Sequence, residues 1–244
     1  MEKAPLAPVH RVPVLSDNYV WLFEYAPGLC AVLDPAEAAP VLAAAEGLGL
    51  RISHILNTHW HPDHVGGNLA IKAASGCAII GPAREKDRIP GIDRAVDEGE
   101  QVGLGKHVGD ILFVGAHTAG HIAYYFPWAR ALFCGDTMFA MGCGRLFEGT
   151  ADDMFAALAK FRRLPASTRI FCAHEYTLSN ARFAVTVEPD NAALAARYAA
   201  VQAARANNEA TVPFLLADEL ATNPFIRAAD SAELGLRRRA KDAF

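Results

Sequence analysis

The chain has 244 residues, of which 52% are hydrophobic and 20% charged, and its formal net charge is −4 at pH 7. A chain of this length and composition can bury a large core in one domain and still form a small second domain. Its slight negative charge gives no overall basic field, which argues against a nucleic-acid or anionic-membrane partner and favours a small soluble substrate.

The first part of the chain predicts strands that give way to alternating strands and helices. Three short β-rich runs, at residues 9–15, 19–25 and 30–34, are separated by the turn-forming segments SDN and APG. An Ala-rich helix is predicted at about 37–48, followed by the strand-like run RISHILNTH. A second helix at about 67–74 then leads to the strand AIIG. This order indicates an α/β fold.

The middle of the chain continues the pattern, and the last part departs from it. Strands are predicted at 111–114, 122–126 and 131–134, then a helix at about 152–163 and the strand RIFCAH. The following sequence is rich in Ala and Arg, with a long helix expected at 191–208. We therefore expect a boundary near residue 175, with a catalytic domain at 1–175 and a small α-helical domain at 176–244.

The cysteines and the N-terminal sequence indicate the type of protein. No CxxC pair occurs, which argues against a disulfide framework and a zinc ribbon, so the cysteines are expected to be buried thiols. No signal-peptide pattern and no stretch of transmembrane length is seen, so we expect a cytoplasmic protein with no membrane partner. The five cysteines are Cys30, Cys77, Cys134, Cys143 and Cys172.

The strongest local signal is the run THWHPDHVGG, which directly follows an apolar strand. In an extended chain His59 and His61 point to the same side and can share one metal ion. Pro62 then bends the path, so that Asp63 and His64 can serve a second ion. The alternative, a polar surface turn that happens to be rich in histidine, does not account for this context of strand, turn and helix.

Three more candidate ligands, His117, Asp136 and His174, each follow a strand-like run. Taken alone, a histidine after a strand is more often a hydrogen-bonded structural residue than a ligand. Together with the histidine-rich run they give seven donors, which suit two divalent ions with one bridging carboxylate. The mixture of imidazole and carboxylate favours Zn²⁺ and allows iron or manganese.

These motifs resemble the metallo-β-lactamase fold superfamily over roughly residues 10–175. The resemblance implies an αββα sandwich in which Asp136 bridges the two ions and Asp34, in VLDP, orients ligands from behind. It assigns the remaining ligands to two sets: His59, His61 and His117 for the first ion, and Asp63, His64 and His174 for the second.

Further segments are similar to the glyoxalase II, or hydroxyacylglutathione hydrolase, family: GDTMFAMGCGRLFEGTADDM, AHEYTLSNARFA and the terminal RRRAKDAF. The resemblance implies that glutathione is held by Arg145, Tyr176, Arg238 and Lys241. Guanidinium and ammonium groups are natural partners for the two carboxylates of glutathione. Phe147 departs from the pattern, because many relatives carry a tyrosine there that donates a hydrogen bond to glutathione.

Each of these residues also has a simpler interpretation. The basic C-terminal residues could form a solvated helix end favoured by the helix dipole. Arg145 could pair with Glu148 or Asp152, and Tyr176 could belong to the core. Cys143 has no base beside it in sequence and is expected to be structural. His121 is expected to lie behind the ligands or in the core.

The resemblance implies hydrolysis of S-(2-hydroxyacyl)glutathione, chiefly S-D-lactoylglutathione, to D-lactate and glutathione, completing methylglyoxal detoxification. A hydroxide bridging the two ions beside Asp136 would attack the thioester, without a protein nucleophile. The alternative is a glutathione persulfide dioxygenase, which uses a single iron on the same scaffold. A non-catalytic metal-binding module is disfavoured by the open position between two ions. We expect the chain to be a monomer.

Overall fold

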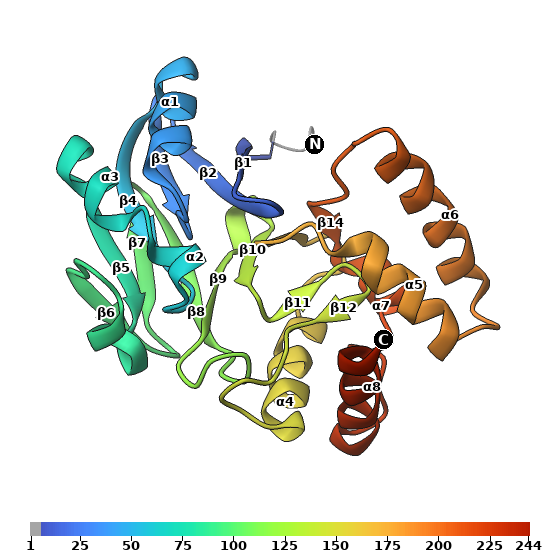
Figure 1. Cartoon of the computed structure of the whole chain (residues 1–244). Coiled ribbons are helices and arrows are strands. Elements are labelled where there is room, and N and C mark those ends of the chain that lie inside the picture. The colour runs from blue at the N-terminus through green and yellow to red at the C-terminus, as the bar shows by residue number, and fades with distance from the viewer. Residues whose placement is uncertain (1–5) are drawn as a thin grey trace. The chain divides into compact units, whose positions relative to one another are not determined.

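The computed structural model describes residues 6–244, and its backbone divides into two compact units (Figure 1). The first unit comprises Met1–Phe113 and Ile122–Phe133, and the second comprises Val114–His121 and Cys134–Phe244. The first five residues, with which the predicted catalytic domain begins, lie outside the described part of the chain. Each unit therefore draws on two separate stretches of sequence.

A mixed six-stranded sheet in the first unit keeps the order of the sequence, from β1 to β6. The pairs β1–β2 and β2–β3 are antiparallel, whereas β3, β4, β5 and β6 run parallel. Helices α1 (Ala38–Gly47) and α3 (Asn68–Ser75) make two of the crossovers that parallel neighbours require. The predicted change from hairpins to alternating elements is confirmed. The strands are β1 (Val9–Val14), β2 (Asn18–Ala26), β3 (Leu29–Leu33), β4 (Arg51–Leu56), β5 (Ala78–Pro82) and β6 (Arg94–Val96).

Strand β2 is buried on both faces. Val20 and Leu22 belong to a buried cluster that includes Val41 of α1. Phe23 points to the opposite face, as alternate residues of a strand do, and its ring centroid lies 4.8 Å from that of Phe126 and 5.2 Å from that of Phe133. Because each such side chain contributes roughly 1.5–3 kcal/mol when fully buried, the run NYVWLFEYA anchors the first sheet on both sides.

A second six-stranded sheet has the order β14-β13-β10-β9-β8-β7. Strands β7 to β10 form an antiparallel meander, and β13 pairs antiparallel with β14. Strand β8 begins at His107, four residues before the predicted start, because it continues a hairpin with β7 through Gly105 at φ +59°. The strands are β7 (Gln101–Leu104), β8 (His107–Phe113), β9 (Ile122–Phe126), β10 (Ala131–Gly135), β13 (Arg169–Cys172) and β14 (Phe214–Leu215).

The second unit is mainly helical, as the sequence after His174 predicts. Helix α4 begins with a capping box. The Thr150 side chain accepts the backbone N–H of Asp153, and the Asp153 side chain accepts the backbone N–H of Thr150. The long helix predicted at 191–208 is α6. The helices are α4 (Ala151–Arg162), α5 (Thr177–Val187), α6 (Ala192–Ala206), α7 (Leu216–Thr222) and α8 (Ser231–Ala243).

Several short elements escape sequence analysis. A two-stranded hairpin, β11 (Met138–Phe139) and β12 (Gly142–Cys143), lies within GDTMFAMGCG, and it is too short for a periodic pattern. Helix α2 (Pro62–Val65) is a single turn within the histidine-rich run. The other irregular elements are the 3₁₀ helices Ala83–Arg88 and Pro127–Ala129.

The state of the cysteines and the length of the apolar helices can both be read from the structure. All five cysteines are free and buried, as predicted. No helix in the described range 6–244 combines the length and apolar character needed to cross a membrane.

A buried carboxylate, that of Glu219 in α7, ties the C-terminal helices to the hairpin. Its Oε2 accepts the backbone N–H of Met141 at 2.8 Å and the Asn223 Nδ2 amide at 2.8 Å, while Oε1 lies 2.6 Å from Arg197 Nη2. Asn223 Nδ2 also donates to the carbonyls of Phe139 and Gly142. Burial raises the pKa of Glu219, and its interaction with Arg197 opposes that shift.

We expect Arg197→Met to lower the free energy of unfolding by about 3 kcal/mol near neutral pH, because it leaves the Glu219 carboxylate buried without its cation. Without Arg197 the pKa of Glu219 rises further above its unfolded value. The deficit is therefore largest where Glu219 is ionised and shrinks as the pH falls and the group takes up a proton.

Urea unfolding of this variant and of the wild type at about pH 7.5 and about pH 5.5 measures the effect. Arg182→Met makes the same substitution at an exposed position of α5 and is the matched control. A deficit for Arg197→Met that is equal at both pH values would contradict this account of the pair.

Candidate metal centre

In the first unit, the histidine-rich run leaves β4 and enters α2 within a few residues. His59 Nε2 and His61 Nδ1 lie 3.0 Å apart, so the two rings converge, and His61 is the residue at which α2 begins. Gly66 allows the backbone after α2 to approach Ala36 closely, because a Cβ at this position would lie 2.5 Å from the carbonyl oxygen of Ala36.

Asp34 lies behind this run. Its φ of +50° is a conformation that few residues other than glycine adopt, and its side chain is buried. Oδ1 accepts the backbone N–H of Thr58 and Oδ2 accepts the Thr58 hydroxyl, both at 2.7 Å. Oδ2 also lies 3.2 Å from His64 Nδ1. The Thr58 hydroxyl is in turn 3.0 Å from His59 Nδ1, so one carboxylate orients two imidazoles.

The carboxylate of Asp63 is held by a residue that sequence analysis did not single out. Asn18 Nδ2 donates to Asp63 Oδ2 at 2.9 Å, across 45 positions of sequence. His64 Nε2 lies 3.5 Å from the same oxygen. Asn18 ends the sequence segment SDN and is the first residue of β2; the composition of that segment signals only a change of chain direction, so no local pattern points to this contact.

In the second unit, two buried imidazoles converge on one carboxylate oxygen. His117 Nε2 and His174 Nε2 each lie 3.4 Å from Asp136 Oδ2. His117 lies between β8 and β9, Asp136 follows β10 and His174 follows β13, so strand ends gather them as the sequence predicts. His117 Nδ1 lies 2.9 Å from the carbonyl oxygen of Arg145, which favours a proton on Nδ1 and leaves Nε2 as the donor atom for a metal.

His121 has a different role. It is fully buried, and its Nε2 accepts the backbone N–H of Asp136 at 3.2 Å, which supports the backbone of the converging carboxylate. The Cys143 thiol is also buried, and burial raises its pKa to about 11, so it is a poor nucleophile at neutral pH.

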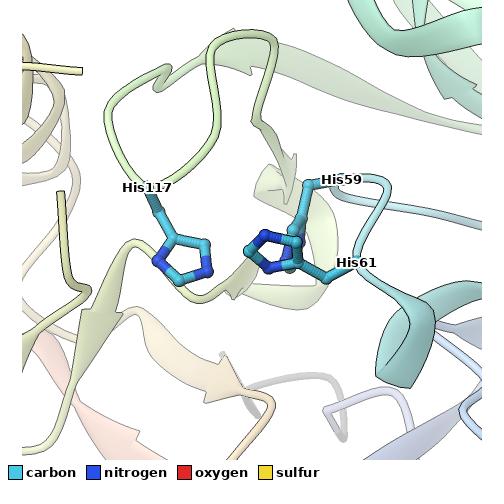
Figure 2. A group of neighbouring side chains, drawn as sticks. All are labelled: His59, His61 and His117. Atoms are coloured by element: carbon cyan, nitrogen blue, oxygen red, sulfur yellow. The ribbon is translucent and has the colours of Figure 1, made fainter. Parts of the chain in front are cut away.

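Within residues 6–244, three groups of donors could each hold a metal ion, and the donor atoms of each group lie within 4.8 Å of one another. Figure 2 shows the first group, with His59 and His61 from the loop after β4 and His117 from the loop between β8 and β9. Imidazoles and carboxylates in this number fit a pair of divalent ions. The groups are His59, His61 and His117; His59, His64 and Asp136; and Asp63, His64 and His174.

The four residues that the resemblance assigns to glutathione all lie in the second unit. Arg145 is exposed, and its Nε lies 3.6 Å from Asp242 Oδ1. The sequence suggested Glu148 or Asp152 as its partner, and this ion pair is with neither of them. Tyr176 is 37% exposed and stacks on the ring of His174, with centroids 4.7 Å apart and planes 6° apart. Phe147, at the departure from the family pattern, is exposed and meets the His117 ring edge-on.

The two basic residues of α8 differ in environment. Arg238 is buried, and its guanidinium donates to the carbonyl of Cys143 at 2.7 Å and to Asp242 Oδ1 at 2.9 Å. Lys241 Nζ donates to the Ser179 hydroxyl at 2.8 Å and to its carbonyl at 3.1 Å. Burial lowers the pKa of Lys241, and the nearby charges of Arg238 and Arg145 act in the same direction.

Two family models together cover nearly the whole chain. Residues 15–174 match the metallo-beta-lactamase superfamily, and residues 175–243 match the hydroxyacylglutathione hydrolase C-terminus. A hydroxyacylglutathione hydrolase of Methylococcus capsulatus is 56% identical over 196 residues, which are 80% of this chain and 77% of the relative. Another, of Rhodospirillum rubrum, is 56% identical over 198 residues, which are 81% of this chain and 77% of the relative.

Similarity to a solved structure supports the fold independently. The crystal structure of ETHE1 from Myxococcus xanthus has a TM-score of 0.73 and 20% sequence identity, and the match covers 95% of this chain and 90% of that chain. Together with the C-terminal family model, it confirms the predicted α/β fold of metallo-β-lactamase type, which consists of two mixed sheets with helices, and the predicted helical region that follows.

We expect Asp34→Asn to weaken metal retention by about 10- to 100-fold, because ligand-orienting groups carry effects of that size. Asparagine keeps an oxygen for the Thr58 amide and tolerates a positive φ, but it has no charge to hold His64. Dialysis against a chelator followed by elemental analysis measures retention.

Asp87→Asn, an equal charge change at an exposed position of the same unit, is the control. If Asp34→Asn retained as much metal as this control, the orienting role of Asp34 would be wrong.

Proposed function

The chain belongs to the hydroxyacylglutathione hydrolase family of the metallo-β-lactamase superfamily, and from that membership we propose its substrate and the role of each site residue. It is a thioester hydrolase. We propose that it acts on S-(2-hydroxyacyl)glutathione, chiefly S-D-lactoylglutathione, and releases a 2-hydroxy acid and glutathione, which is the last step of methylglyoxal detoxification.

The observation that carries the proposal is the approach of His117 and His174 to one oxygen of Asp136. A carboxylate between two imidazoles from different strand ends is the arrangement that a bridging ligand needs. On this basis Asp136 would serve both ions, His59, His61 and His117 the first, and Asp63, His64 and His174 the second.

We propose the ions from donor chemistry alone. Five imidazoles and two carboxylates favour Zn²⁺, and iron or manganese would suit the same donors. When bound, two such ions supply a water of lowered pKa as nucleophile and polarise the carbonyl of the thioester. The chain itself orients the donors, through Asp34 for His59 and His64 and through the Arg145 carbonyl for His117.

No protein nucleophile or strong general acid is required. The leaving group is a thiol with an ordinary pKa of about 8.5, so it can depart as the anion. Cys143, which stands close in sequence to Asp136, is a thiol whose pKa is raised to about 11 by burial, and it does not compete for the role of nucleophile.

The second unit supplies the charges that glutathione needs. Arg145 and Lys241 offer cations to its carboxylates, and Tyr176 extends the surface of the His174 ring toward solvent. Arg238 stands between Cys143 and Asp242, so we propose that it contributes to the positive field while its guanidinium keeps those contacts.

A boundary near residue 175 is supported by the change of family model between residues 174 and 175. Five free, buried cysteines suit a reducing compartment such as the cytoplasm. A monomer remains our expectation, and light scattering of the purified chain tests it.

We expect purified protein to hydrolyse S-D-lactoylglutathione, to lose that activity on chelation and to regain it when Zn²⁺ is restored. The reaction is monitored by the loss of the thioester absorbance. Protein that binds two metal ions but leaves the thioester intact would refute the substrate. Oxygen uptake with glutathione persulfide would then identify the alternative dioxygenase.

We expect Lys241→Ala to raise KM about fivefold, a change of about 1 kcal/mol, with kcat changed less than about twofold. The reason is that the Lys241 cation would contact a part of the substrate far from the reacting carbonyl, and so it would stabilise the ground state and the transition state equally. Steady-state kinetics provide the measurement. Arg239→Ala removes the same charge from an exposed position of α8 and should leave KM unchanged, and equal effects of the two variants would indicate a general charge effect.

A further inference from the structure

A carboxylate of the chain itself lies among the basic residues of the second unit. Asp242, in the last turn of α8, accepts from Arg238 Nη2 at 2.9 Å and lies 3.6 Å from Arg145 Nε, and both contacts use the same oxygen, Oδ1. The charge of Asp242 raises the pKa of Lys241, against the effects of the two arginines. One acid thus faces three cations.

The two arginines depend on Asp242 to different degrees. Arg238 is 5% exposed and also donates to the carbonyl of Cys143, so the fold holds its guanidinium independently of Asp242. The side chain of Arg145 is 64% exposed, and Asp242 is 42% exposed. An ion pair with this exposure and a single contacting oxygen is weak and can exchange partners.

A substrate carboxylate can bind Arg145 better than Asp242 does. It can present both oxygens to the guanidinium, a bidentate geometry that is stronger than the single contact of Asp242. Asp242 Oδ1 is already engaged by Arg238, which limits how far it can turn toward Arg145. Asp242 therefore occupies Arg145 without satisfying it fully.

We propose that Asp242 is an internal competitor of the substrate carboxylate: it pairs with Arg145 in the free enzyme, is displaced when the thioester binds, and returns when glutathione leaves. This inference rests on the proposed glutathione thioester substrate. It assigns Asp242 a role in setting affinity, distinct from binding substrate or stabilising the transition state. It also predicts that loss of the acid strengthens binding, which is unusual for a residue beside an active site.

The test is Asp242→Asn, which keeps the shape of the side chain and removes its charge. We expect KM for S-D-lactoylglutathione to fall about two- to fivefold, with kcat within about twofold of wild type, because an exposed pair of this kind has a small energy. The decrease should be larger at about 20 mM than at about 500 mM ionic strength, since salt screens exposed charges.

Two further variants make the result specific. Asp218→Asn makes the same charge change at an exposed position of α7 and should leave KM unchanged. In an Arg145→Ala background, Asp242→Asn should lower KM much less, because the guanidinium for which Asp242 and the substrate compete is then absent. A rise in KM for Asp242→Asn would show that Asp242 instead holds the arginines in place, and an unchanged KM would show that it has no influence. Either result would overturn the proposal.

Calorimetric titration with glutathione separates this inference from the proposed function. Tighter binding of glutathione by Asp242→Asn than by wild type, in protein that fails to hydrolyse the thioester, would uphold the competition and reject the substrate. Normal thioester hydrolysis by wild type, with equal glutathione affinity and equal KM for both proteins, would uphold the substrate and reject the competition.

Discussion

The contact between Asp34 and Thr58 is the constraint on which the first half of the candidate metal centre depends. Imidazoles are useful ligands only if their rings are fixed, and a loop at a strand end has no ladder hydrogen bonds to fix it. Asp34 binds both the amide and the hydroxyl of Thr58 and reaches His64 with the same carboxylate. Its own left-handed backbone turns the chain directly after β3, so the parallel pairing of β3 and β4 brings acid and ligand run together.

The second half of the centre is supported by helices far along the chain. Asp136 is followed within two residues by the hairpin β11–β12, whose backbone is held by Asn180, Glu219, Asn223 and Arg238. Three of these side chains donate to hairpin carbonyls, and Glu219 accepts from Met141, which has a φ of +55°. The helical region thus stabilises the backbone next to Asp136, the proposed bridging ligand, and it also carries the basic residues proposed to bind the substrate.

Features carried by consecutive residues could be predicted from the sequence. The spacing in THWHPDH predicts donors that lie close together, and the longer segments predict most of the strands and α6, although they do not predict the short strands β6, β7 and β14. Contacts between positions far apart in sequence could not be predicted, as in the bond from Asn18 to Asp63 and the four contacts on the hairpin. The basic residues of α8 show the same limit, because a charge pattern cannot tell the buried Arg238 from the exposed Arg239. Only the folded chain reveals that Asp242 lies between Arg238 and Arg145.

The burial of all five thiols has a consequence for an enzyme whose product is itself a thiol. Oxidised glutathione reacts with exposed thiolates to form mixed disulfides, and the rate depends on access and on the thiolate fraction. Here Cys30, Cys77, Cys143 and Cys172 are buried with raised pKa values, and Cys134 is buried as well. The fold therefore limits both the access and the thiolate fraction on which glutathionylation depends.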